Sequence, residues 1–200
     1  MPRTKEQYEA MREATNDKIQ SAAIKLFVQK GFAATGVQDI ADEAGISIGL
    51  LYRHYKTKAE LFSGLVSYAV EGLNTLCDLM MSDMQPKEII EQIVNEIYAD
   101  MTSGEDFSNM LTLMTQAIYT DTAVMQEVVT ADVKLFQCTE KVIEKGQKLG
   151  QFRTGNSAEM AALFFSSIQG LGIMQTALRE RFTMPSPKQI TMFLFQEEIQ

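Results

Sequence analysis

Apolar residues recur every three or four positions through most of the chain, which is the period of a helix with one buried face. The first such stripe runs from Ile19 to Phe27, and Gly31 suits the left-handed cap that ends this helix. Alternation with a period of two, which marks half-buried strands, is hard to find anywhere. The pattern therefore predicts an all-α protein.

Breaks between the stripes predict about nine helices. Gly45 separates two short apolar segments, Pro86 suits the first turn of a helix, and Ser103-Gly104 ends that helix. Glycines between positions 146 and 155 mark one loop, and two prolines set off the last helix. The expected helices are one that ends at residue 31, then 37–44, 48–54, 58–82, 86–102, 106–118, 121–148, 157–181 and 187–198.

Charge is divided unevenly along the chain. The 200 residues carry a formal net charge of −8, which by itself disfavours binding to the phosphates of nucleic acid. Residues 1–58, however, hold nine Lys and Arg against seven Asp and Glu, so the remaining 142 residues carry a net charge of −10. This division fits a mildly basic module on an acidic body, although chance solvation of surfaces explains it as well.

The sequence offers little for catalysis or for metal binding. His54 is the only histidine, and Cys77 and Cys138 lie far apart in apolar contexts without a CxxC motif, as expected of buried thiols in a reducing cytosol. We therefore expect no catalytic residue, no metal and no cofactor. Because the N-terminus is charged and no run of eighteen apolar residues occurs, we also expect no signal peptide, no membrane span and a cytoplasmic location.

Residues 35–58, TGVQDIADEAGISIGLLYRHYKTK, have the features of a helix-turn-helix. Ala41 lacks bulk, so a second helix can cross close to the first, and Gly45 can adopt the positive φ of a tight turn. Ser47 suits the N-cap of the second helix. The exposed part of that helix would enter a major groove through Ile48, Gly49, Leu50, Tyr52, Arg53 and His54.

The side chains around this helix suit a phosphate backbone. Tyr52, His54 and Lys58 can reach phosphates through a hydroxyl, an imidazole and an ammonium group, and Arg53 can contact a base or a phosphate. Gly49 would let the start of the helix approach the DNA closely. Taken singly, a tyrosine on a short helix is more often a packing residue, and a lone histidine is more often a surface or core residue, than a DNA contact. The prediction therefore depends on their combination.

The stretch AAIKLFVQKGFAATGVQDIADEAGISIGLLYRHYKTKAELF, within about Ile19 to Leu65, resembles the DNA-binding domain of the TetR family of bacterial transcription regulators. The resemblance implies a three-helix head in residues 1–60 and a larger helical body in residues 61–200, which dimerises and usually binds a small-molecule inducer. The body is matched only loosely, by residues 141–174.

The resemblance also implies which residues contact DNA. It places contacts on Gln38, near the start of the helix before the turn, and on residues 47–50, which include Ser47, at the start of the recognition helix. It assigns backbone contacts to Tyr52, His54 and Lys58. Many family members have Ser or Thr in place of Gly36 and Arg in place of Gln38, so the contacts expected there are weakened. Since residues 48 and 50 are apolar, readout would rely partly on thymine methyl groups.

The last two expected helices carry apolar stripes, which suit either the core of one chain or a dimer interface. The resemblance favours a four-helix interface with a two-fold mate. Two heads about one DNA turn apart, roughly 34 Å, would then read a palindromic operator in double-stranded DNA. The expected interface residues are Phe164, Phe165, Ile168, Leu171, Gln175, Ile190, Phe193 and Leu194.

Methionine is abundant, with 13 in the chain. Thioether side chains adapt to varied ligands, so a pliable effector pocket is one interpretation, and an ordinary core is the other. The pocket residues would be Tyr98, Met101, Met110, Met114, Tyr119 and Phe136. The nearby acids Glu96, Asp100, Glu105 and Asp106 would favour a cationic ligand, or they form a solvated face.

These observations together predict a homodimeric repressor that a small apolar effector releases from its operator. The alternatives are a ligand-independent repressor or an activator of the same fold, a helical enzyme acting on lipophilic substrates, and a structural dimeric protein. Whether residues 1–14 extend the first helix or form a loose arm that touches phosphates through Arg3, Lys5 and Arg12 stays open.

Overall fold

The computed structural model describes residues 4–104, 106–119 and 122–196. These residues confirm the predicted all-α class, because they form helices and a single isolated β-bridge. The helices are α1 Lys5–Lys30, α2 Val37–Glu43, α3 Ile48–His54, α4 Lys58–Met80, α5 Pro86–Ser103, α6 Asp106–Ala117, α7 Thr122–Lys148, α8 Ser157–Leu178 and α9 Pro187–Thr191, with a short 3₁₀ turn Arg179–Arg181 after α8.

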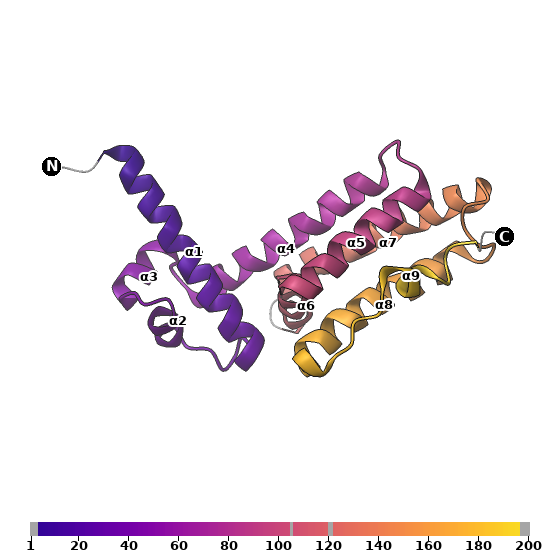
Figure 1. Ribbon diagram of the computed structural model, residues 1–200. Helices are drawn as coiled ribbons and strands as arrows, with labels where there is room; N and C mark the ends of the chain where they lie inside the picture. The colour runs from indigo at the N-terminus through magenta and orange to yellow at the C-terminus, as the bar shows by residue number, and fades with distance from the viewer. Residues whose placement is uncertain (1–3, 105, 120–121, 197–200) are drawn as a thin grey trace.

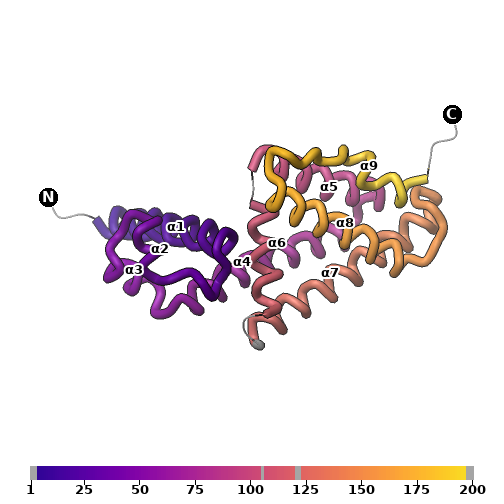
Figure 2. The backbone as a smooth tube through the Cα atoms, turned by 90° about the horizontal axis from the view of Figure 1, so that it is seen from below, coloured from indigo at the N-terminus to yellow at the C-terminus, as the bar shows by residue number. Residues whose placement is uncertain are grey.

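Figures 1 and 2 show α1–α3 grouped at one end of the molecule, with α4 leaving this group and running into a body formed by α5–α9. We call α1–α3 the head. Within the body, α4 packs most extensively on α7, and α7 packs in turn on α8. Since α4 takes part in both groups, it is the mechanical connection between them.

One cluster of buried side chains runs from the head into the body. It joins Phe27 of α1 and Leu51 of α3 to Phe62 of α4, and it continues through Leu113 of α6 to Val128 of α7. The expected boundary at residue 60 lies in the first turn of α4, beside these shared contacts. The division into residues 1–60 and 61–200 stays a prediction.

Helix α1 begins earlier than its apolar stripe. The hydroxyl of Thr4 accepts a hydrogen bond from the Gln7 amide (3.3 Å), and the Gln7 side chain accepts one from the Thr4 amide (3.1 Å). This reciprocal cap fixes the helix start, so Lys5 and Arg12 lie on an ordered extension of α1. Arg3 lies outside the described residues.

The predicted last helix, 187–198, is wrong in length, because α9 ends at Thr191. The chain beyond it pairs with the loop after α7: the Arg153 amide donates to the Leu194 carbonyl (2.8 Å), and Phe152 forms an antiparallel bridge with Phe195. The ring centroids of these two phenylalanines lie 5.5 Å apart. A contact between distant segments has therefore replaced the last turns of the expected helix.

Part of the predicted dimer interface is also wrong, because those side chains lie in the core of the chain itself. Ile190 is buried on α9, which packs on α5 and α8, and Leu194 just after this helix is fully inaccessible. Both belong to a second buried cluster, distinct from the one that joins head and body, together with Phe164 and Ile168 of α8. The remaining expected residues are partly buried: Phe165, Leu171 and Phe193, which pack against this cluster, and Gln175, whose amide donates to the Met101 carbonyl (2.8 Å).

The apolar surface of α8 lies on its other side. Leu163, Ile173, Met174 and Leu178 are 40–52 % exposed and recur at helical spacing along one face. By length and composition, residues Ser157–Arg181 are the one candidate membrane span in the described part of the chain, and 22 % of its apolar window is buried. Only length and composition support a membrane span here. A helix whose apolar face is covered by another copy of the chain would also be long, apolar and largely exposed in a single chain.

Candidate nucleic-acid interface

The turn between α2 and α3 has the geometry that the sequence predicts. Gly45 adopts φ +64°, and the Ile46 amide donates to the carbonyl of Ala41 (3.0 Å), which is fully buried where the two helices cross. The Ser47 hydroxyl accepts a hydrogen bond from the Leu50 amide (3.2 Å) and so caps α3. These local contacts set the angle at which α3 leaves the turn.

One side of α3 faces away from the rest of the head. Leu51 is buried in the core, whereas Ile48, Tyr52 and Arg53 are exposed, Ile48 by 37 % and Tyr52 by 49 %. Gly49 lies on the same side, and a Cβ added there would meet no atom within 4 Å. This face of α3 can therefore approach a flat or grooved surface without obstruction.

The other predicted contact residues surround this face unequally. Ser47 is exposed, whereas Leu50 and His54 are partly buried. Gln38 of α2 is exposed, and its amide donates one hydrogen bond to the Asp42 carboxylate (2.7 Å), which leaves its second N–H and its oxygen for a base. The structure thus brings together residues 47–54 on α3 and its N-cap, whereas Gln38 lies on α2 and is hydrogen-bonded to Asp42.

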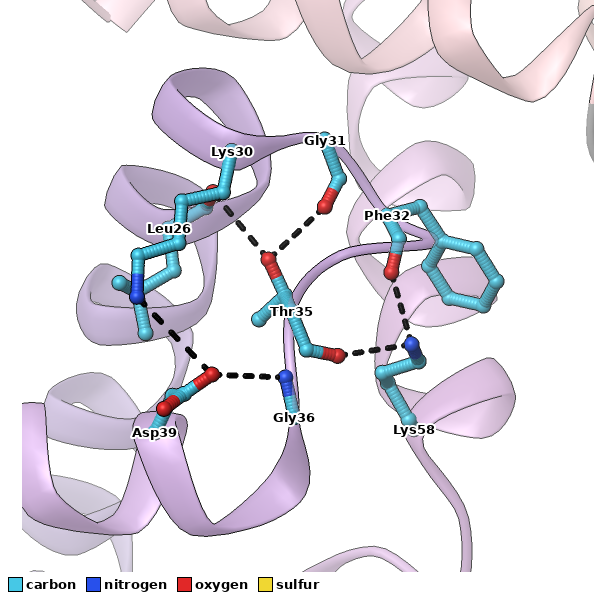
Figure 3. A network of polar contacts seen from close by, with 8 residues as sticks. All are labelled: Leu26, Lys30, Gly31, Phe32, Thr35, Gly36, Asp39 and Lys58. Carbon is cyan, nitrogen blue, oxygen red and sulfur yellow. Dashed lines mark hydrogen bonds and ion pairs between the residues drawn. The ribbon is translucent and has the colours of Figure 1, made fainter.

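Lys58 has a structural task that the sequence did not predict. Its ammonium group donates to the carbonyl oxygens of Phe32 and Thr35 (2.7 Å each) and lies 4.4 Å from the centre of the Phe32 ring. Figure 3 shows this side chain reaching into the loop between α1 and α2. With two of its three protons engaged, Lys58 serves first to hold that loop.

Thr35 completes the same network from the other side. Its hydroxyl is buried and lies within hydrogen-bond distance of the carbonyls of Gly31 (2.8 Å) and Leu26 (3.3 Å) at the end of α1 (Figure 3). The amide of Gly36 then donates to the Asp39 carboxylate (2.9 Å) at the start of α2. These contacts fix the position of α2, on which α3 rests, so they support the exposed face indirectly.

Tyr55 attaches the end of α3 to α1. Its hydroxyl donates to the Asn16 side chain (2.7 Å) and accepts a hydrogen bond from the amide of Gln20 (3.1 Å). No local motif identifies the partners of Tyr55, because they lie 35 and 39 positions away in the sequence.

Ion pairs in the head leave its net charge unchanged. Lys25 pairs with Glu43, and Lys30 with Asp39 (3.9 Å), so each pair offsets one lysine against one acid. Burial lowers the pKa of His54, and the nearby Arg12 guanidinium lowers it further. His54 is therefore largely neutral at pH 7 when nothing is bound, and an anion beside it would favour its protonation.

Gln116 of α6 connects the body to the head. Its side-chain amide donates to the Phe27 carbonyl (2.8 Å), and its oxygen accepts a hydrogen bond from the Phe32 amide (3.0 Å). Both head atoms lie at the junction of α1 and the loop that Lys58 holds. A displacement of α6 would therefore pull directly on the support of α2 and α3.

The predicted effector residues do not share one setting. Met110 and Met114 pack into the cluster that spans head and body, whereas Phe136 packs with Phe165 in the second cluster (centroids 6.2 Å apart). Met101 is buried and Tyr98 partly so. Tyr119 is 84 % exposed, so it does not share the buried setting of the methionines, and its place in an effector pocket stays a prediction.

A groove of about 780 Å³ lies between α5 and residues 187–196, and none of the six predicted residues lines it. Lys87, Lys188, Met192 and Phe195 are among its lining residues. No group of three or more potential metal ligands occurs among the residues that the structure describes.

Comparisons with known proteins agree with this geometry. Residues 19–65 match the family model described as bacterial regulatory proteins, tetR family. The chain is 28 % identical over 187 residues to the uncharacterized HTH-type transcriptional regulator YvkB of Bacillus subtilis (strain 168), which covers 88 % of this chain and 91 % of that protein.

Solved structures share the fold. The TetR family transcriptional regulator PfmR from Thermus thermophilus superposes with a TM-score of 0.68 at 22 % identity, covering 88 % of this chain and 93 % of that one. A putative transcriptional regulator from Saccharomonospora viridis, in complex with choline, has a TM-score of 0.68 at 18 % identity, with 92 % and 100 % covered.

Proposed function

Because the chain belongs to the TetR family of bacterial transcriptional regulators, we propose that it is a homodimeric repressor that binds a palindromic operator and leaves it when a small effector binds. The observation that carries this proposal is the exposed face of α3, with Ile48, Tyr52 and Arg53 around an unobstructed Gly49. The family consists of regulators rather than enzymes, which removes the enzymatic alternative.

In this proposal, α3 lies in the major groove of cytoplasmic operator DNA. Arg53 is the exposed cation that can hydrogen-bond a base edge, and Ile48 offers an apolar contact to a thymine methyl group. Tyr52 and His54 contact phosphates and so fix the register of the helix. Lys58 supports this arrangement from behind through the loop between α1 and α2.

The exposed apolar face of α8 supports the dimer. Leu163, Ile173, Met174 and Leu178 form a stripe with Gly170 and Ala177. The missing side chain of Gly170 and the small one of Ala177 let a second helix approach closely. A two-fold copy of the chain would cover this stripe and would place two heads on the two halves of a palindrome. The body, proposed as residues 61–200, would thus dimerise and bind the effector, whereas residues 1–60 would bind DNA.

Contact between α6 and the head supports effector control. An effector that moves α6 would act on Phe27 and Phe32 through Gln116, and the choline complex is a precedent for a ligand in this fold. Coupling of this kind is reciprocal, so operator DNA must weaken effector binding by the same factor. An operator affinity that no effector changes would instead favour a ligand-independent regulator of the same fold.

The test uses an operator fragment selected from genomic DNA and fluorescence anisotropy with the full-length protein. Each lost contact to a base or phosphate costs about 1–3 kcal/mol, so the double variant Tyr52→Ala, Arg53→Ala should bind at least tenfold more weakly. The control variant Tyr68→Ala, Lys141→Ala removes an exposed tyrosine and an exposed cation from α4 and α7 and should bind normally. A folded α3 variant that binds like the control would contradict the proposal.

A further inference from the structure

Two buried cysteines that are 61 positions apart in the sequence meet at the contact between α4 and α7. Cys77 of α4 is 2 % exposed and Cys138 of α7 is 7 % exposed, and both belong to the second buried cluster. Both thiols are free, and the Cys138 thiol is close enough to Cys77 to raise its pKa. The sequence spacing gives no sign of this pairing.

The packing of α4 on α7 sets this approach. The two helices run parallel, because residues that face each other differ in number by 59 or 60 at three separate contacts along them. Cys77 and Cys138 continue this register. The three contacts join Ser67 to Glu127 (3.1 Å), Asn74 to Lys134 (2.9 Å) and Met80 to Thr139 (3.5 Å).

The surroundings of Cys77 favour its protonated form. Burial raises the pKa of Cys77 to about 12, with a further contribution from the neighbouring Cys138 thiol. Cys77 therefore keeps its proton near neutral pH and can donate it toward the Cys138 sulfur. Lys134, one turn before Cys138 on α7, places a positive charge beside the pair.

The pair lies next to exposed positions along the chain. Asp78 follows Cys77 on α4, and Gln137 precedes Cys138 on α7, and both of these neighbours are exposed. Because the thiols themselves are buried, a reagent reaches them only through local opening of the α4–α7 contact, and a small neutral reagent needs a smaller opening than a bulky one.

We propose that Cys77 and Cys138 form a thiol–disulfide switch that a small peroxide oxidises. The sulfur of Cys138, after losing its proton, attacks one oxygen of hydrogen peroxide; the O–O bond breaks, and the departing hydroxide takes up a proton to form water. The sulfur of Cys77 then attacks the resulting sulfenic acid. A disulfide forms, the S–O bond breaks, and the hydroxide leaves with the Cys77 proton as a second water.

The electrons balance in this sequence, because the two thiols lose two electrons and one peroxide takes them up. Thiols of the reducing cytosol reverse the reaction by exchange, which suits a switch better than a permanent crosslink. Burial makes the forward reaction slow at low peroxide concentration, so the switch responds to sustained oxidation.

The consequence for DNA binding rests on the proposed function. Disulfide formation brings the two sulfur atoms, which belong to free thiols in the reduced protein, to about 2.05 Å from each other. This draws α4 toward α7 near one end of α4, while Phe62 and Leu65 near its other end pack into the head cluster. The oxidised and reduced proteins therefore hold their heads differently and differ in operator affinity.

The test oxidises the folded full-length protein with hydrogen peroxide and measures its intact mass and its peptides after digestion without reductant. We expect a loss of two hydrogen atoms, a peptide pair linked through Cys77 and Cys138, and recovery of the free thiols with dithiothreitol. We also expect at least a threefold difference in operator affinity between the oxidised and reduced forms, and no such difference in Cys77→Ala or Cys138→Ala.

Val142→Ala is the matched control, because Val142 is buried in the same cluster one turn after Cys138, and this variant should keep the response. A linked pair that appears only in denatured protein, over-oxidation of single cysteines, or a disulfide that leaves operator affinity unchanged would each overturn the switch. The mass measurement needs only the wild-type chain and no DNA. Binding of the reduced protein to the operator tests the proposed function separately.

Discussion

Replacing Gln116 with alanine should loosen the attachment of the head to the body. The substitution removes two hydrogen bonds, one to the Phe27 carbonyl (2.8 Å) and one from the Phe32 amide (3.0 Å). The Phe27 carbonyl keeps its bond from the Gly31 amide (2.9 Å), so the Phe32 amide suffers the larger loss. The variant therefore tests how much the Gln116 side chain contributes to the contact between α6 and the head.

The expected cost follows from these two bonds. A neutral hydrogen bond contributes about 1 kcal/mol net, so the free energy of unfolding should fall by about 1–2 kcal/mol. In a chain of this length, each kcal/mol lowers Tm by roughly 2–4 °C. Urea unfolding at fixed protein concentration measures the loss, and hydrogen exchange of the Phe32 amide, which should become faster, locates it.

Thr115→Ala is the matched control. Thr115 is the exposed neighbour of Gln116 on α6, and its hydroxyl donates only to the Leu111 carbonyl of its own helix in the described contacts (2.8 Å). If Gln116→Ala is no less stable than Thr115→Ala, and the Phe32 amide exchanges at its wild-type rate, the reasoning is refuted.

Three further predictions concern packing, pH and assembly. Gly146→Ala should lower the free energy of unfolding by about 1–3 kcal/mol in a urea titration, because the added Cβ would lie 2.3 Å from the Phe152 ring. Gly64→Ala is the control: its Cβ meets no atom, so it should raise the free energy of unfolding by about 0.5–1 kcal/mol. Equal effects of the two substitutions would contradict this packing. Because folding lowers the pKa of His54, protonation of this residue favours the unfolded chain when no DNA is bound. The contribution of neutral His54 to the free energy of unfolding is therefore complete above pH 6.5 and decreases as the pH falls toward the lowered pKa. A phosphate beside His54 reverses this preference, so operator affinity should rise as the pH falls below 6.5, and a His54→Gln variant with the same pH slope would rule out this contact. Ile173→Glu places an unpaired charge in the proposed dimer interface and should weaken self-association about 100-fold or more in sedimentation analysis, whereas Tyr68→Glu on exposed α4 should not.

Signals that lie within a few residues of each other predicted much of the fold. Ser47 as an N-cap and Gly45 as a turn residue placed α3 at 48–54, and Pro86 placed the start of α5. These features act through the local backbone, so they are readable without the rest of the chain.

Contacts between distant segments account for what the sequence analysis missed. Phe195 leaves the expected helix because Phe152 and Arg153 lie 43 and 42 positions away in sequence but adjacent in space. Leu194 and Leu163 belong to similar apolar stripes, yet one is fully buried and the other is 52 % exposed. Only the tertiary packing decides which stripe faces the core.

In the candidate site, too, the features that depend on local sequence were predictable and those that depend on distant contacts were not. The exposed face of α3 was predictable, because it depends on one short helix and its cap. The task of Lys58 was not, because it depends on the loop at residues 32–35 folding back over the start of α4. The pairing of Cys77 with Cys138 required the register of α4 on α7.

The central claim is that the face of α3 reads an operator. Its most direct test is to select genomic fragments that the wild-type protein binds and to map the protected bases by footprinting. The account predicts an enriched two-fold symmetric sequence whose half-sites lie about one DNA turn apart or a multiple of it, with enrichment lost in the folded variant Tyr52→Ala, Arg53→Ala. Equal enrichment of the same fragments by that variant, or no enriched sequence with the wild type, would contradict the claim.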